Sequence, residues 1–235
     1  MAVVYSETTD GYIGNLTATD AATCRGDAST SGTISNFTGR SARSGVYVVK
    51  SSKGAGAWII QRSYFVFDLS EEDGTVDSCT LEVYMDNTSN AALSTNEKKV
   101  IPVEATALAG NASDYGNCFS SGSTLGTALG PERTVSGVAG YHGFSMTGDT
   151  SSGGIKVIND AVGTEGAGGI VTICLMDHYW DYEDRDIEAT HGSDKPAQHA
   201  VTFANNIGTT RDPKLDITYV AVTVTDNATF FGANF

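Results

Sequence analysis

Strict alternation of apolar and polar side chains near residue 80 is the feature that most limits what this chain can fold into. From residue 79 to residue 86 every second side chain is apolar, and Thr80, Glu82 and Tyr84 lie between them. A period of two is typical of a β-strand with one face on a core and the other in water. The preceding segment, 58–69, has a similar pattern, and a short acidic turn with Gly74 joins the two, so we predict two adjacent strands. The apolar positions are Cys79, Leu81, Val83 and Met85 in one strand and Ile59, Phe65, Phe67 and Leu69 in the other.

Other short apolar segments occur along the whole chain, separated by stretches rich in Gly, Ser, Thr and Asn. Many short strands joined by permissive loops are typical of an all-β domain. We predict an all-β fold for residues 1–220, a jelly-roll-like two-sheet β-sandwich with long loops, notably at 106–154. One short helix is expected at 155–162, where Ile155, Ile158 and Val162 recur at helical spacing. The remaining predicted strands are 3–5, 11–14, 33–37, 46–49, 99–105, 170–176, 200–203 and 215–224.

The last predicted strand changes phase within its own length. Leu215, Ile217 and Tyr219 alternate toward the core, but the apolar residues after Tyr219 have the opposite parity. Because a one-residue shift sends side chains to the other face of a sheet, we expect a bulge near Tyr219 or a segment that leaves the domain. We expect the C-terminal arm, residues 221–235, to dock on a neighbouring subunit, and packing on its own core is the alternative. The candidate contact residues of the arm are Val222, Val224, Phe230, Phe231 and Phe235.

The charge balance argues against two classes of partner. The chain has 28 acidic and 14 basic residues, a formal net charge of −14. Nucleic-acid and anionic-membrane binding depend on clustered Lys and Arg, and the sequence has no such cluster, so neither partner is expected. No apolar run approaches the roughly 20 residues of a membrane span, and the chain begins without a secretion signal. We therefore expect synthesis in a cytoplasm, with the four cysteines as thiols.

The densest group of candidate site residues follows the predicted strand 170–176. Carboxylates of this kind supply the oxygen ligands that calcium prefers, although their spacing is not that of an EF-hand. Calcium is therefore the one cofactor that we consider, and a solvated acidic loop is the alternative. The candidate metal ligands are Asp177, Asp181, Asp184 and Asp186.

The same segment contains three aromatic residues, Tyr179, Trp180 and Tyr182. Such rings stack on sugars, and these three are candidate glycan-binding residues. The alternative is that they cover the edge of the core. No motif of a hydrolase or of a phosphate-binding loop occurs in the chain, and we predict that it is not an enzyme.

Three passages together resemble the DNRLRE-type β-sandwich, a jelly-roll-like family of surface, extracellular and virion proteins. The resemblance spans roughly residues 5 to 220, and residues 8–13 also resemble single-domain virion proteins of marine tailed phages. It implies that Phe65 and Phe67 fill the core and that Arg62 pairs with Asp68 or with another carboxylate. The matching residues are Arg62, Phe65, Phe67, Asp68, Leu69 and Ser70; Gly74, Val76, Ser78, Thr80, Leu81, Val83 and Tyr84; and Arg211, Pro213, Leu215, Thr218 and Tyr219.

The resemblance implies a phage virion structural protein, such as a capsid decoration, fibre or tail component. We expect it to be made in the host cytoplasm, to lie on the virion surface and to form a homo-oligomer or bind other virion proteins. The alternative is a carbohydrate-binding module that recognises a polysaccharide through the aromatic residues 179–182.

Overall fold

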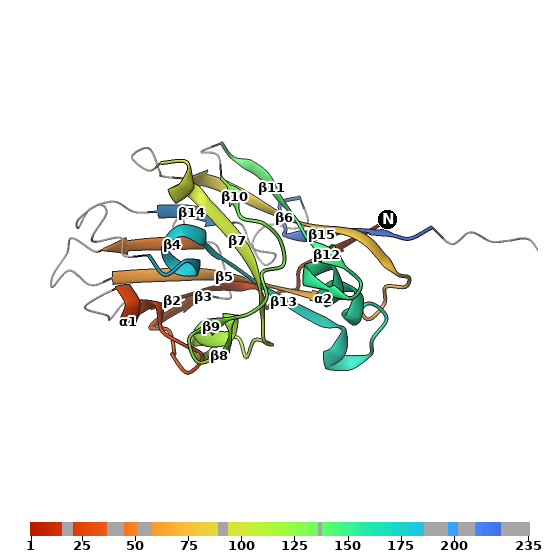
Figure 1. Cartoon of the computed structure of the whole chain (residues 1–235), viewed down its shortest axis with the longest axis horizontal. Helices are drawn as coiled ribbons and strands as arrows, with labels where there is room; N and C mark the ends of the chain where they lie inside the picture. The colour runs from red at the N-terminus through yellow and green to blue at the C-terminus, as the bar shows by residue number, and fades with distance from the viewer. Residues whose placement is uncertain are drawn as a thin grey trace, which may run out of the picture.

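The two strands predicted on either side of Gly74 form β5 (Trp58–Asp68) and β6 (Val76–Thr88). The computed structural model describes residues 1–15, 21–36, 45–50, 58–88, 94–135, 138–185, 197–201 and 210–221. Strands β5 and β6 belong to two antiparallel layers that face each other across a hydrophobic core (Figure 1). The predicted all-β sandwich is therefore confirmed.

Strand β5 organises the first layer, which we call the central sheet. It pairs with β4 and β13 along one side and with β2 along the other. Strand β13 then pairs with β7, and β7 pairs with β10, while β3 pairs with β2 at the opposite edge. The bounds are β2 Gly11–Asn15, β3 Ile34–Asn36, β4 Gly45–Lys50, β7 Lys99–Ala105, β10 Arg133–Thr134 and β13 Ile170–Asp177.

Strand β6 organises the second layer, which we call the outer sheet. It pairs with β15 and β14 along one side and with β11 along the other, and β1 pairs with β15 at the edge. Strand β14 also pairs with β4, so the two layers are joined on one side by a continuous path of hydrogen-bonded strands. The bounds are β1 Ala2–Tyr5, β11 Gly140–Ser145, β14 Ala197–Val201 and β15 Lys214–Tyr219.

The main core fills the space between the layers. Phe65 and Phe67 of β5 are fully buried there against Leu81 and Val83 of β6, as the alternation predicts. The predicted helix forms as α2 (Gly153–Ala161), which packs on the same core with Ile155 and Ile158. No helix within the described ranges is long and apolar enough to cross a membrane.

The far face of the central sheet is also covered, so β5 is buried on both sides. Short elements of the segment predicted as long loops form this cover, and they enclose Tyr64 and Tyr115. A third small cluster holds Trp58 and Trp180 beside the short helix α1 (Ala21–Arg25). The covering elements are the 3₁₀ helix η2 Ala112–Cys118, β8 Phe119–Ser121 and β9 Thr124–Leu125.

Two differences from the prediction concern the outer sheet. Strand β15 ends at Tyr219 rather than at residue 224, and its register against β6 shifts between Thr218 and Tyr219, so the predicted irregularity is confirmed. Strand β11 lies where we expected loops with short strands, because its two glycines interrupt the local signal of Tyr141 and Phe144. The arm residues Val222, Val224, Phe230, Phe231 and Phe235 lie outside the described residues.

Candidate functional site

The segment with the predicted site residues leaves the end of β13 as a single turn of π-helix, η4 (His178–Tyr182). Asp177 begins this turn, because its Oδ1 atom accepts a hydrogen bond of 2.7 Å from the Trp180 amide. The Glu183 amide donates a hydrogen bond of 3.0 Å to the His178 carbonyl and so completes the turn. This geometry buries Trp180 and Asp181 and leaves Asp184 exposed at a positive φ of 52°.

Asp181 forms a buried ion pair with Arg62 of β5. Arg62 Nε lies 2.8 Å from Asp181 Oδ2, and Nη2 lies 2.7 Å from Oδ1, so the contact is bidentate. Both residues are 0 % exposed. Burial opposes the guanidinium charge most strongly, but Asp181, Cys118 and Tyr115 together outweigh that cost, and the pKa of Arg62 lies well above its ordinary value. The predicted partner of Arg62 is Asp68 or another carboxylate, and the structure shows Asp181 in this role. The Asp68 alternative is wrong, because Asp68 is exposed and its Oδ1 accepts a hydrogen bond from the Ser70 amide.

The same guanidinium holds two further segments of the chain. It donates to the backbone carbonyls of Tyr115 at 3.0 Å and of Arg25 at 2.9 Å. The rings of Tyr115 and Phe119 lie against it, with centroids 4.3 and 5.0 Å from Cζ. We call this group of Arg62, Asp181 and the contacting residues the arginine node. Its contacts are saturated within the fold, which is the arrangement of a structural element.

The predicted metal ligands are not gathered around a common point in the part of the chain that the structure describes. Asp181 is neutralised by Arg62, and Asp184 lies 3.7 Å from the Arg25 guanidinium. Burial, with a further contribution from Asp181, raises the pKa of Asp177 to about 8. Asp186 lies outside the described residues, and no group of three or more potential ligands occurs within them. Calcium binding stays a prediction.

The predicted aromatic platform is divided between the core and the surface. Trp180 is 3 % exposed and belongs to the cluster around Trp58. Tyr179 meets the Trp180 ring edge to face at 4.5 Å and is covered on one side by Arg185, whose Cζ lies 4.6 Å from the ring centroid. Tyr182 stacks on His178. The three rings therefore present no common flat face to a sugar.

The described residues line hollows near η4 and beside β7. One near η4 has a volume of about 130 Å³, and its lining charges are paired, with Lys99 Nζ 3.3 Å from Glu132 and Arg185 against Glu183. That volume is below the range of ordinary ligand pockets. Two grooves of about 430 and 410 Å³ lie on either side of Glu104 in β7. Neither groove is lined by a histidine or a cysteine.

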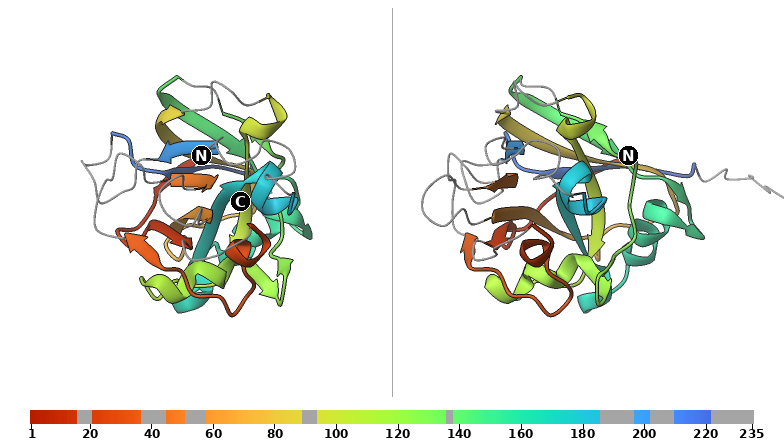
Figure 2. Two further views of the ribbon diagram at one scale, coloured as in Figure 1. Left: turned by 90° about the vertical axis from the view of Figure 1, so that its left-hand side faces the viewer. Right: turned by 60° about the vertical axis from the view of Figure 1, so that its left-hand side comes forward.

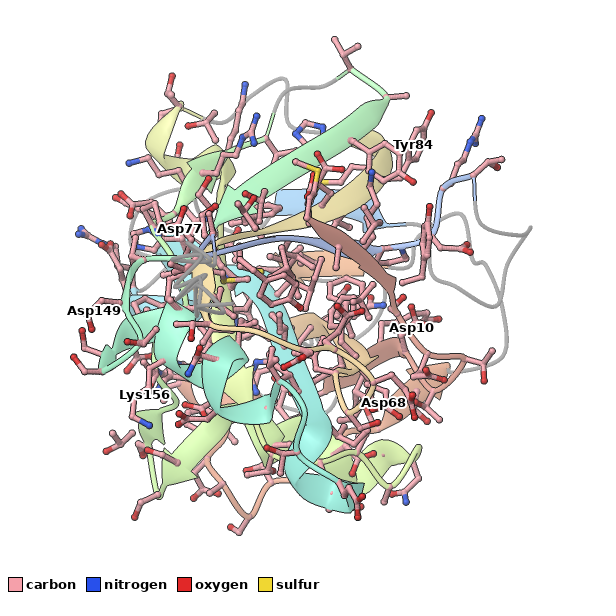
Figure 3. The ribbon with its side chains drawn as sticks, turned by 90° about the vertical axis from the view of Figure 1, so that its right-hand side faces the viewer. Asp10, Asp68, Asp77, Tyr84, Asp149 and Lys156 are labelled. Carbon is pink, nitrogen blue, oxygen red and sulfur yellow. The ribbon has the colours of Figure 1, made fainter. Side chains whose placement is uncertain are left out.

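The outward face of the outer sheet carries an aromatic and cationic surface, which we call the tyrosine face. Tyr84 and Tyr141 are register partners, and their rings meet edge to face at 5.4 Å. Arg211 lies 4.6 Å from the centroid of the Tyr84 ring, and Lys214 Nζ lies 5.0 Å from that of Tyr141. Tyr5 of β1 is the register partner of Lys214 and completes the group. Figure 3 shows Tyr84 on the opposite side of the molecule from Lys156 of α2.

The exposed apolar side chains concentrate on this same sheet. The structure describes six large hydrophobic residues with substantial exposure, and every one lies on or beside β1, β11 or β15. Tyrosine and arginine beside exposed aliphatic groups are typical of protein–protein contact surfaces. The residues are Met1 (86 %), Val138 (73 %), Val220 (52 %), Val3 (44 %), Tyr5 (42 %) and Tyr141 (37 %).

This surface was not identified from the sequence. Its residues are widely separated along the chain, and only the register of β1, β15, β6 and β11 brings them together. One local signal was present, since Ala2–Tyr5 contains no charge and no proline. No protein family matches the sequence, and no curated protein matches it at a significant level.

Proposed function

We propose that the chain is a non-enzymatic structural protein of a phage virion, a capsid decoration, fibre or tail component that acts by protein–protein assembly. The observation that carries the proposal is the concentration of exposed apolar side chains on the strands and strand ends of the outer sheet. Proteins that remain single in water seldom concentrate such residues on one sheet. The virion setting comes from the sequence resemblance to phage proteins described above.

The partners in this proposal are further copies of the chain or other proteins of the virion surface. Two acidic molecules with a net charge of −14 each repel one another, so assembly has to use surfaces with little negative charge. The tyrosine face meets this requirement, because Arg211 and Lys214 offset Glu82 within it. The C-terminal arm meets it as well, since Asp226 is the one charged side chain in residues 221–235.

The test is the solution mass of the full chain compared with a chain truncated after Tyr219. We expect the full chain to assemble and the truncated chain to stay monomeric, with circular dichroism confirming that both are folded. Tyr219 is the last residue of β15, so the truncation keeps every strand that the structure describes. A full chain that is monomeric at every concentration, alone and with particles of its phage, would contradict the proposal.

The carbohydrate-binding alternative makes a different prediction. It requires binding to a glycan array that is lost in Tyr179→Ala and in Tyr182→Ala, the two partly exposed rings of the segment. Trp180→Ala is a poor test because the Trp180 side chain is core, and its removal would weaken folding. Binding by the folded chain that these variants abolish would favour the alternative over assembly.

A further inference from the structure

We propose that the free edge of β1 receives residues 220–225 of a second copy of this chain, which add to the outer sheet as an extra strand. The inference rests on the proposed assembly function and names the surface that the C-terminal arm contacts. Extended segments commonly bind exposed sheet edges in this way, because the added backbone satisfies the unpaired amides and carbonyls of the edge strand.

Strand β1 has an open and unprotected edge. Among the described residues, the backbone of Ala2–Tyr5 bonds to β15 and to no other strand. Its side chains are apolar on both faces, a pattern that is typical of strands covered on both faces of the sheet. Val3 and Tyr5 remain 44 % and 42 % exposed, so the outward row has no cover.

The other edge strands within the described ranges are protected. Strand β3 has three residues and β10 has two, so neither offers a long row of backbone groups. At the edge of β11, the Arg133 side chain donates to the Gly143 carbonyl. Short edges and edge charges are common devices against strand addition, and β1 has neither a charge nor a proline.

The arm leaves the fold at the correct place and with a suitable sequence. The Val220 amide donates to the Thr75 carbonyl at 2.8 Å, so the chain still follows β15 there, and Ala2 faces Ile217 just before this point. Figures 1 and 2 show the N-terminus beside this end of β15. Residues 220–225 read Val-Ala-Val-Thr-Val-Thr, an uncharged alternating segment with high strand propensity.

The topology favours a second copy over the chain's own arm. Strand β1 is antiparallel to β15, so a strand antiparallel to β1 on its free side has to run in the direction of β15 and begin near Tyr5. The chain's own arm starts at the Ala2 end of β1. It would have to pass back along the four residues of β1, about 13 Å, before it could pair. The arm of a second copy can approach in the required direction directly.

Photo-crosslinking tests the contact in the full chain. We would place p-benzoylphenylalanine at position 3 and mix copies of normal and heavy nitrogen content before irradiation. The expected product joins position 3 of one copy to residues 220–226 of the other, as peptides of mixed isotope content. Crosslinks in assembled material that fall only outside 220–226, or only within one copy, would overturn the inference.

A second test measures self-association in variants that carry a charge on the β1 edge or at a control position. Val3→Lys places a charge on the free edge, and Ser123→Lys places the same charge in the exposed turn between β8 and β9, away from the outer sheet. We expect Val3→Lys to weaken self-association about tenfold or more, with Ser123→Lys close to the unchanged protein. The full-chain arm variant with Val222→Asp and Val224→Asp should lose association as well.

These outcomes distinguish a failure of the β1-edge inference from a failure of the proposed assembly function. If the arm variant loses association and Val3→Lys retains it, the arm acts elsewhere and the inference is wrong, while the assembly function stands. If the unchanged protein never associates with itself but binds particles of its phage, the inference alone is wrong, and if it does neither, both are wrong. Loss of association in Val3→Lys and in the arm variant, with Ser123→Lys unaffected, supports both.

Discussion

Replacement of Asp177 by asparagine should change how the stability of the protein depends on pH. The Asp177 side chain is 1 % exposed, Oδ1 accepts from the Trp180 amide, and Oδ2 has no hydrogen-bond partner among the described residues. Burial and then the nearby Asp181 charge raise the pKa of Asp177 to about 8, from an ordinary value of 3.8. The folded protein therefore keeps this proton at neutral pH, and the unfolded chain releases it.

The sign of the effect follows from proton linkage. Between pH 4 and pH 8 the folded state binds more protons than the unfolded state, so this group makes the free energy of unfolding fall as the pH rises. A separation of about four pH units corresponds to roughly 5 kcal/mol as an upper limit, at 1.36 kcal/mol for each unit. This is a large part of the roughly 5–15 kcal/mol that holds a domain folded.

Urea unfolding at pH 5, 7 and 9, followed by the fluorescence of the buried tryptophans, measures the effect. Asp177→Asn keeps the acceptor for the Trp180 amide and carries no proton to lose. We expect it to lie within about 1 kcal/mol of the unchanged protein at pH 5 and to be several kcal/mol more stable at pH 9. Asp184→Asn, at an exposed position, is the control. Its free energy of unfolding should change with pH as that of the unchanged protein does.

If the free energy of unfolding changes with pH equally in Asp177→Asn and in the unchanged protein, this reasoning is wrong. The same titrations carried out with calcium test the metal prediction. A bound cation would hold Asp177 ionised and remove the loss of stability at high pH, and it would do so in the unchanged protein but not in Asp177→Asn.

Two further predictions concern the frame of the fold. Asp181→Asn removes the anion from the arginine node. It should lower the free energy of unfolding, measured in urea titrations, by about 3–5 kcal/mol. The control Asp68→Asn, at the surface, should change this free energy by less than about 1 kcal/mol. Gly154→Ala should lower the free energy of unfolding by roughly 1–3 kcal/mol, because the new Cβ would lie 2.0 Å from the Leu129 carbonyl oxygen. A thermal melt that matches that of the unchanged protein would contradict this prediction. Gly143→Ala is its control, since the nearest atom to a Cβ there is a Thr80 methyl group at 3.1 Å.

Much of the sandwich was predictable from local patterns. Strand β7 has the predicted bounds of 99–105, and β13 extends the predicted strand by one residue, because both are apolar runs that end at polar loops. Helix α2 begins two residues earlier than predicted, at a pair of glycines that carry no helical signal of their own. Strand β11 depends on its pairing with β6 rather than on its own composition.

The candidate sites were less predictable, for a reason visible in the geometry. The segment 177–186 has the composition of a solvated acidic loop, yet its first part forms a π-helical turn that buries Trp180 and Asp181. The partner that makes this burial tolerable is Arg62, 119 positions earlier in the chain. Within the described ranges β1 pairs with β15 alone, and no local sequence pattern shows that its other edge is free.

The arginine node has a consequence for the rate at which the folded protein is lost. Its contacts to Arg62 span 37, 53 and 119 positions of sequence, so all four segments have to be in place before the guanidinium is fully satisfied. Contacts that close such long loops are expected to form after the rate-limiting step of folding. Weakening them should then accelerate unfolding and leave refolding nearly unchanged, so the node would act mainly on the lifetime of the native state.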